Sequence, residues 1–221
     1  QALANQLVNS TLLRVEALKA IGVETSLAVV LVGNDAASEV YVGRKIKQCA
    51  QAGIRSIEHG NLIDAKSAKL LASKGGFMIA NLVTYFEMKE RAASFGMTAD
   101  MLAKNEVVLE GALRSLEICK KAGVEVGFGS DLLGHLQTEQ SKEFIHRAKV
   151  LKPIEIIRQA TLVGAKILRH EGKLGVVEPG AFADFIVVDG NPLKKLELFL
   201  DQGAHLSAIM KGGKFHKNEL N

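Results

Sequence analysis

The sequence predicts an α/β protein with a parallel sheet of about four strands, flanking helices and an antiparallel β tail. Short apolar runs alternate with longer segments of helical periodicity up to residue 172. Strands that alternate with helices at this spacing pair in parallel through right-handed crossovers. From residue 173 onward, Gly and Pro turns separate short strands with no helical segment between them.

The first 53 residues predict a helix, a strand and a second helix. Apolar residues recur at steps of three to five over residues 2–20, and Gly22 follows as a helix stop. Residues 27–32 form a continuous apolar run that is typical of a buried parallel strand. Residues 36–51 return to helical periodicity. We therefore expect residues 1–53 to form the first structural unit.

Residues 54–172 repeat one theme, in which a short strand leads into a helix. The expected strands span residues 56–59, 77–83 and 124–129. The expected helices span residues 64–73, 87–121 with an interruption near Gly96, 141–150 and 154–169. Because the carboxyl ends of parallel strands share one edge of a sheet, any active site is expected in the loops there.

Residues 173–221 form a third expected unit that lies outside the α/β core. A strand is predicted over residues 185–188, and a hairpin over residues 208–215 turns at Gly212 and Gly213.

Composition narrows the classes of partner. The formal net charge is +4, and the basic residues are scattered with no basic tract that contains aromatic residues, so we expect no nucleic-acid partner. No apolar stretch has the roughly 18 residues of a membrane span, and no leader-like segment is seen, which favours a cytoplasmic protein without membrane contact. The two cysteines, Cys49 and Cys119, are too few for a disulfide framework.

Four sequence blocks stand out in residues 54–221. They are SIEHGNLID at 56–64, GFGSDLLG at 127–134, GVVEPGAFADFIVVD at 175–189 and MKGG at 210–213. Together these blocks resemble the C-terminal half of the metal-dependent amidohydrolases. They stand in the order and at the separations typical of that family, and the resemblance is strongest to its prolidase-like and imidazolonepropionase-like branch. Residues 54–221 are therefore similar to an amidohydrolase half.

The resemblance implies half of a (βα)8 barrel over residues 54–172 and a remnant of a small β-sandwich over residues 173–221. Amidohydrolases bind metal through an HxH pair on the first strand, a lysine on the fourth, histidines on the fifth and sixth, and an aspartate on the eighth. His59 matches the sixth-strand histidine, and Asp131 matches the aspartate that also acts as general base. No HxH pair occurs in this chain. His135, four residues after Asp131, is a candidate third ligand.

Residues 10–53 resemble a different enzyme. The run SLAVVLVGNDAAS at 26–38 and the residues that follow it are similar to the N-terminal segment of bifunctional methylenetetrahydrofolate dehydrogenase/cyclohydrolase. Its catalytic Tyr and Lys match Tyr41 and Lys45, which lie four residues apart on one face of the expected helix. Packing residues on a borrowed helix are the simpler interpretation of this pair. No GxGxxG follows a strand, so NAD(P) is not expected.

The two resemblances together indicate a chimera joined near residues 52–54, where a helix leads into a strand in both parents. Three functions remain open. The first is a scaffold without full activity that keeps a vestigial metal site, with zinc as the possible metal. The second is a residual hydrolase of C–N bonds in a small amide or dipeptide, and the third is a folate-binding remnant.

Four parallel strands cannot close an eight-stranded barrel, so a homodimer that completes the barrel is also expected.

Overall fold

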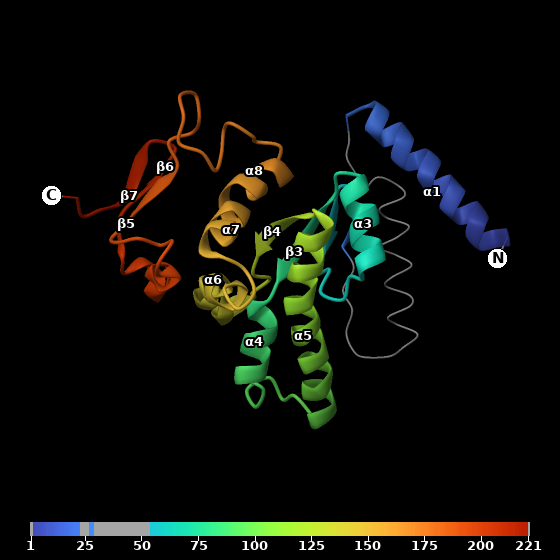
Figure 1. Cartoon of the computed structure of the whole chain (residues 1–221), viewed down its shortest axis with the longest axis horizontal. Coiled ribbons are helices and arrows are strands. Elements are labelled where there is room, and N and C mark those ends of the chain that lie inside the picture. Colours follow the sequence, from blue (N-terminus) through green and yellow to red (C-terminus); the bar gives the residue numbers. More distant parts are fainter. Residues whose placement is uncertain (1, 23–26, 29–53, 221) are drawn as a thin grey trace.

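The structure is a computed structural model that describes residues 2–22, 27–28 and 54–220. A central sheet lies among helices, with α1 (Ala2–Ala20) at one end of the molecule and a separate C-terminal sheet at the other (Figure 1). The helix expected over residues 2–20 is confirmed. The helix expected over residues 36–51, with Tyr41 and Lys45, lies outside the described residues.

The central sheet is parallel and has the strand order β1-β2-β3-β4. The strands span Leu27–Ala28 for β1, Ser56–Glu58 for β2, Phe77–Asn81 for β3 and Glu125–Gly129 for β4. The predicted parallel sheet is thus confirmed. In its register, Ile57 pairs with Met78 and Met78 with Val126, while Asn81 pairs with Gly129 at the carboxyl end.

Helices lie between the strands from β2 to β4 and follow β4 along the chain. They are α3 (Ala65–Ser73), α4 (Val83–Glu90), α5 (Ala99–Ala122), the 3-10 helix η1 (Gly134–Glu139), α6 (Lys142–Arg147), α7 (Pro153–Arg158), the π-helix η2 (Gln159–Val163) and α8 (Gly164–Ile167). Local capping residues fix several ends: the Asp64 carboxylate accepts the Ser67 N–H at 2.7 Å, and Gly123 ends α5 at a φ of 77°. Within the described residues, no helix is long and apolar enough to cross a membrane.

The boundary between β3 and α4 differs from the sequence expectation. Residues 77–83 were expected to form a strand and the helix to begin at residue 87, yet β3 ends at Asn81 and α4 begins at Val83. One carboxylate oxygen of Glu143 accepts the N–H groups of Leu82 at 2.9 Å and Val83 at 2.7 Å. A side chain from α6 therefore satisfies the first N–H groups of α4, and the sequence around residue 83 does not show this.

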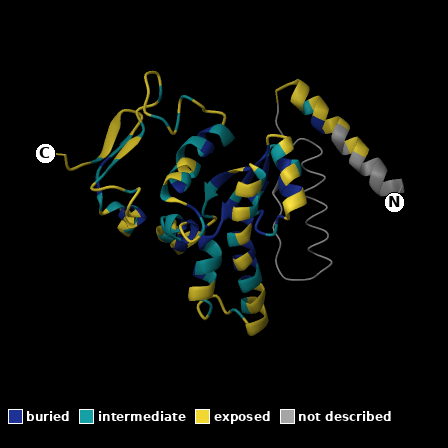
Figure 2. Cartoon of the chain, viewed as in Figure 1, coloured by how far each residue is buried: buried dark blue, intermediate teal, exposed yellow. Residues whose placement is uncertain are grey.

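The C-terminal segment forms the predicted antiparallel sheet, with the order β5-β6-β7. The elements are β5 (Phe185–Val188), the 3-10 helices η3 (Leu196–Phe199) and η4 (Asp201–Gly203), β6 (Leu206–Lys211) and β7 (Lys214–Asn218). Exposed residues predominate on β7, and β5 has no buried residue, whereas buried residues gather in the central sheet and on the helices beside it (Figure 2).

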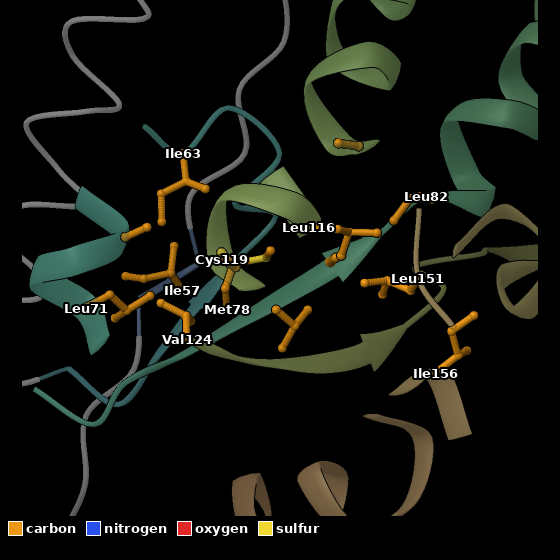
Figure 3. Packing of buried hydrophobic residues seen from close by; sticks show 14 of the residues in the cluster. Ile57, Ile63, Leu71, Met78, Leu82, Leu116, Cys119, Val124, Leu151 and Ile156 are labelled. Carbon is orange, nitrogen blue, oxygen red and sulfur yellow. The ribbon is translucent and has the colours of Figure 1, made fainter. Parts of the chain in front are cut away.

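The main hydrophobic core packs the central sheet against helices α3 and α5 and extends to Leu151 and to Ile156 of α7 (Figure 3). Ile57 and Met78 of the sheet pack there with Leu71 of α3 and Leu116 of α5, all at most 1% exposed. Cys119 lies in the same cluster, where burial raises the pKa of its thiol to about 12. Cys119 is therefore a buried, protonated thiol, consistent with a reading as a small apolar residue.

Gly111 allows the loop after β2 to lie against α5. A Cβ atom at residue 111 would lie 2.9 Å from the carbonyl oxygen of Asn61 and would overlap the Leu62 side chain. Alanine is the better helix former by about 1 kcal/mol. We nevertheless expect Gly111→Ala to lower the free energy of unfolding by about 1–3 kcal/mol, because overpacking costs more than the gain in helix propensity. Urea denaturation measures the change, with exposed Glu110→Ala as the control in the same helix. A stabilised Gly111→Ala protein would contradict the close packing.

Candidate functional site

The two residues matched to the metal ligands lie at the carboxyl ends of two parallel strands, β2 and β4, that flank β3. His59 directly follows β2, and Asp131 lies two residues beyond the end of β4. Both adopt a left-handed backbone conformation, with φ values of 55° and 53°. The N–H of His59 donates to the carbonyl of Ile79 at 3.1 Å, which holds the first turn after β2 against β3. Such conformations are uncommon for residues other than glycine, although Asp and His adopt them more often than most, and they occur often at functional sites.

The side chains of His59 and Asp131 face one another. His59 Nδ1 lies 3.7 Å from Asp131 Oδ2, and the side chains are 14% and 49% exposed respectively. This separation is too long for a hydrogen bond, although the two groups attract one another whenever the ring carries a positive charge. The structure therefore brings together residues that are 72 positions apart in the sequence.

Asn81 is a third polar residue of the site that the sequence analysis missed. It ends β3, between the strands that carry His59 and Asp131, and is 5% exposed. Its side-chain amide lies 3.2 Å from His59 Nδ1. Because the strand was expected to continue to residue 83, Asn81 did not stand out as the residue at its carboxyl end.

Tyr85 in the first turn of α4 also belongs to this region. Burial raises the pKa of the Tyr85 phenol, and the Asp131 carboxylate raises it further. Tyr85 therefore keeps its proton in the neutral pH range and can donate a hydrogen bond. Its backbone carbonyl accepts the Asn105 amide at 2.9 Å, which links this turn to α5.

His135 lies in η1, where it is exposed, and its ring stacks loosely on Phe95 with centroids 6.4 Å apart. Over residues 2–22, 27–28 and 54–220, no three His, Cys, Asp or Glu side chains form a group that could hold a metal ion. A role for His135 as third ligand stays a prediction. Tyr41 and Lys45 lie outside the described part of the chain.

A network of charged side chains ties η1 and α6 to α4 beside the site. Glu87 of α4, which is fully buried, pairs with Lys142 at 2.8 Å and with Arg91 at 2.9 Å. Glu139 at the end of η1 pairs with the same two cations at 2.9 and 2.6 Å. Hydrogen bonding to Lys142 and Arg91 lowers the pKa of Glu139, so the Glu139 carboxylate is charged at neutral pH. It positions the segment that follows Asp131.

Most of the chain is similar to one family of known proteins. Residues 43–215 match the family described as "Amidohydrolase family". The crystal structure of an amidohydrolase superposes with a TM-score of 0.81 at 40% identity, and the match covers 94% of this chain and 48% of that chain. A prolidase crystallised with N-methylphosphonate-L-proline gives a TM-score of 0.80 at 39% identity, with coverage of 92% and 47%. The chain spans about half the length of these proteins.

A second likeness covers the N-terminal part. Residues 1–73 match the catalytic domain of tetrahydrofolate dehydrogenase/cyclohydrolase. Bifunctional protein FolD 2 of Pseudomonas syringae pv. syringae is 60% identical over 58 residues, which are 26% of this chain and 19% of that protein. Bifunctional protein FolD of Bordetella petrii is 48% identical over 71 residues, or 32% and 24% of the two chains. The two resemblances expected from the sequence are confirmed, and the matched ranges overlap over residues 43–73.

Proposed function

The chain belongs to the amidohydrolase family, and on that premise we propose that it is a chimeric amidohydrolase-derived protein that lacks full catalytic activity by itself. The observation that carries this proposal is the isolated pair of His59 and Asp131. Within the described residues, no third His, Cys, Asp or Glu completes a metal-binding group with them.

The pair does not meet the needs of a catalytic metal centre. Catalytic zinc sites use three protein ligands and keep the fourth position for water or substrate. His59 and Asp131 supply two, and their 3.7 Å contact gives the histidine a partner in the protein itself. We infer a vestigial site that binds zinc weakly, with Asp131 as its former general base.

Metal content tests the proposal directly. We expect the protein, after dialysis, to retain well below one zinc per chain, and to hydrolyse dipeptides and N-acyl amino acids no faster than its Asp131→Asn variant. Elemental analysis and an amide-hydrolysis assay with added zinc measure the two quantities. One zinc per chain that is lost in His59→Ala and Asp131→Asn, but kept in the exposed control His216→Ala, would overturn the proposal.

A residual hydrolase of C–N bonds is the second candidate. The two prolidase-like and amidohydrolase structures at about 40% identity favour it, and a small amide or dipeptide would be the substrate class. This function needs ligands beyond His59 and Asp131, such as those of a second copy of the chain. The variant His135→Ala tests where the further zinc ligands come from. The zinc content of the variant would fall if His135 were a ligand, and it would not change if the further ligands came from a partner chain.

Self-association is part of the same proposal. Within the described strands, β4 pairs only with β3 and forms one edge of the sheet. Large apolar side chains are also exposed around the C-terminal sheet, including Val177 at 95% and Phe182 at 53%. An unpaired strand edge and exposed apolar surface both favour pairing with another chain. We infer a homodimer that completes a barrel, and light scattering distinguishes a dimer from a monomer.

A folate-binding remnant is the third candidate, and the 60% identity to a bifunctional FolD protein favours it. The matched segment is 19% of that protein, so binding would depend on a small part of its fold. Calorimetric titration with tetrahydrofolate tests it, with Lys45→Met as the variant. Heat of binding that disappears in the variant would support this function.

A cytoplasmic location is a further prediction.

A further inference from the structure

The side-chain amide of Asn81 has only one orientation that satisfies its neighbours. On one side of the amide lie two backbone carbonyl oxygens, that of Ala80 at 3.0 Å and that of Gly129 at 3.3 Å. Carbonyl oxygens only accept hydrogen bonds, so the NH2 group of Asn81 must face them. The amide oxygen of Asn81 then faces His59 Nδ1 at 3.2 Å.

This orientation determines where the hydrogen lies on the neutral His59 ring. The amide oxygen of Asn81 can only accept, so Nδ1 must be the nitrogen that carries hydrogen. Asp131 Oδ2 lies 3.7 Å from the same nitrogen, and its negative charge also favours hydrogen at Nδ1. The lone pair of the neutral ring is therefore at Nε2.

We propose that Asn81 is a positioning residue that holds His59 as the Nδ1–H tautomer and so keeps Nε2 free to bind a metal ion or to accept a proton. This inference rests on the proposed function, because it takes His59 to be one of the two residues retained in the vestigial site. Hydrogen-bonded partners of this kind fix the ring orientation and tautomer of histidine ligands in metal sites.

Gly129 is required for this arrangement. It pairs with Asn81 across the two strands, and a Cβ atom at residue 129 would overlap the Asn81 side-chain amide. Any larger residue at 129 would displace the amide from the carbonyls that orient it. Strands β3 and β4 thus jointly determine the state of a histidine that follows β2.

Nitrogen-15 NMR of the histidine rings in the metal-free protein tests the proposal. At about pH 9 the imidazole rings are neutral and the two tautomers give distinct ring-nitrogen patterns. We expect His59 to show the Nδ1–H pattern in the natural protein and to move to the Nε2–H form, which free histidine prefers, in Asn81→Leu. Exposed His135 serves as the internal control and should not change.

An Nε2–H pattern for His59 in the natural protein, or an Nδ1–H pattern that persists in Asn81→Leu, would overturn the role of Asn81. The natural protein alone decides the first point if the variant does not fold. Failure of the zinc proposal is a separate result: stoichiometric zinc in the dialysed protein would overturn the vestigial site and leave the tautomer of the metal-free ring unchanged.

Discussion

We expect Arg147→Met to lower the free energy of unfolding by about 3–5 kcal/mol, because it leaves the Glu143 carboxylate buried without its cation. Both side chains are completely buried, and Arg147 Nε donates to Glu143 Oε1 at 2.7 Å. The Arg147 guanidinium also donates to the carbonyls of Ala80 at 2.6 Å and Gly127 at 3.1 Å. One side chain therefore bridges α6, β3 and β4.

Burial already raises the pKa of Glu143, and the positive charge of Arg147 opposes that rise. Without Arg147 we expect the pKa of this carboxyl group to rise further, so that it takes up a proton more readily, which relieves part of the cost. The residual loss then comes from the unpaired carbonyls of Ala80 and Gly127 and from the lost contact with the Phe128 ring, whose centroid lies 4.7 Å from the guanidinium carbon.

Urea denaturation of three proteins measures this effect. Arg147→Met should be the least stable, and the double variant Arg147→Met with Glu143→Leu should recover part of the loss because no buried charge remains. Lys104→Met is the matched control, since Lys104 pairs with Asp100 at 2.8 Å on the exposed side of α5 and should change stability by less than about 1 kcal/mol. A loss in Arg147→Met no larger than in the control would contradict the buried network.

Elements determined by local sequence could be predicted. The helix expected over residues 64–73 begins at Ala65, directly after its N-cap Asp64, and the helix expected to end at residue 121 ends at Ala122, directly before Gly123. The parallel pairing of the strands followed from their alternation with helices. The start of α4 could not be predicted, because its cap is supplied by Glu143, sixty residues further along the chain.

In the candidate site too, the sequence identifies some residues and misses others. His59 and Asp131 could be identified because each lies in a motif of consecutive residues. Asn81 and Tyr85 could not, since their roles depend on three-dimensional neighbours: the carbonyl of Gly129 for the one and the carboxylate of Asp131 for the other. The length of β3 mattered too, because a strand that continued to residue 83 would have placed Asn81 inside the strand and away from its end.

The second large effect is a loss of stability at acid pH, and it comes from His146 of α6. Its side chain is buried with 8% exposure, and its ring stacks on Phe86 with centroids 3.7 Å apart and planes within 2°. Neither ring nitrogen has a hydrogen-bond partner. Burial lowers the pKa of His146 to about 4, and the charges of Lys149 and Lys142 act in the same direction. The folded protein thus holds this ring in its neutral form.

The sign of the pH dependence follows from the direction of that shift. The ordinary pKa of a histidine is 6.5 and the folded value is about 4, so between these values the unfolded chain binds a proton that the folded protein does not. The contribution of His146 to the free energy of unfolding is fully present above about pH 6.5 and is lost as the pH falls towards 4. We expect His146 to account for about 2 kcal/mol of lost stability between about pH 7 and pH 4.5.

Urea denaturation at both pH values, on the natural protein and on His146→Leu, isolates this contribution. Leucine keeps the buried apolar contact with Phe86 and cannot take up a proton, so the variant should lose about 2 kcal/mol less than the natural protein on acidification. The carboxylates titrate in both proteins and cancel in the difference. Equal losses in the two proteins would mean that His146 is protonated as readily in the fold as in the unfolded chain, which its burial and its two unpartnered nitrogens argue against.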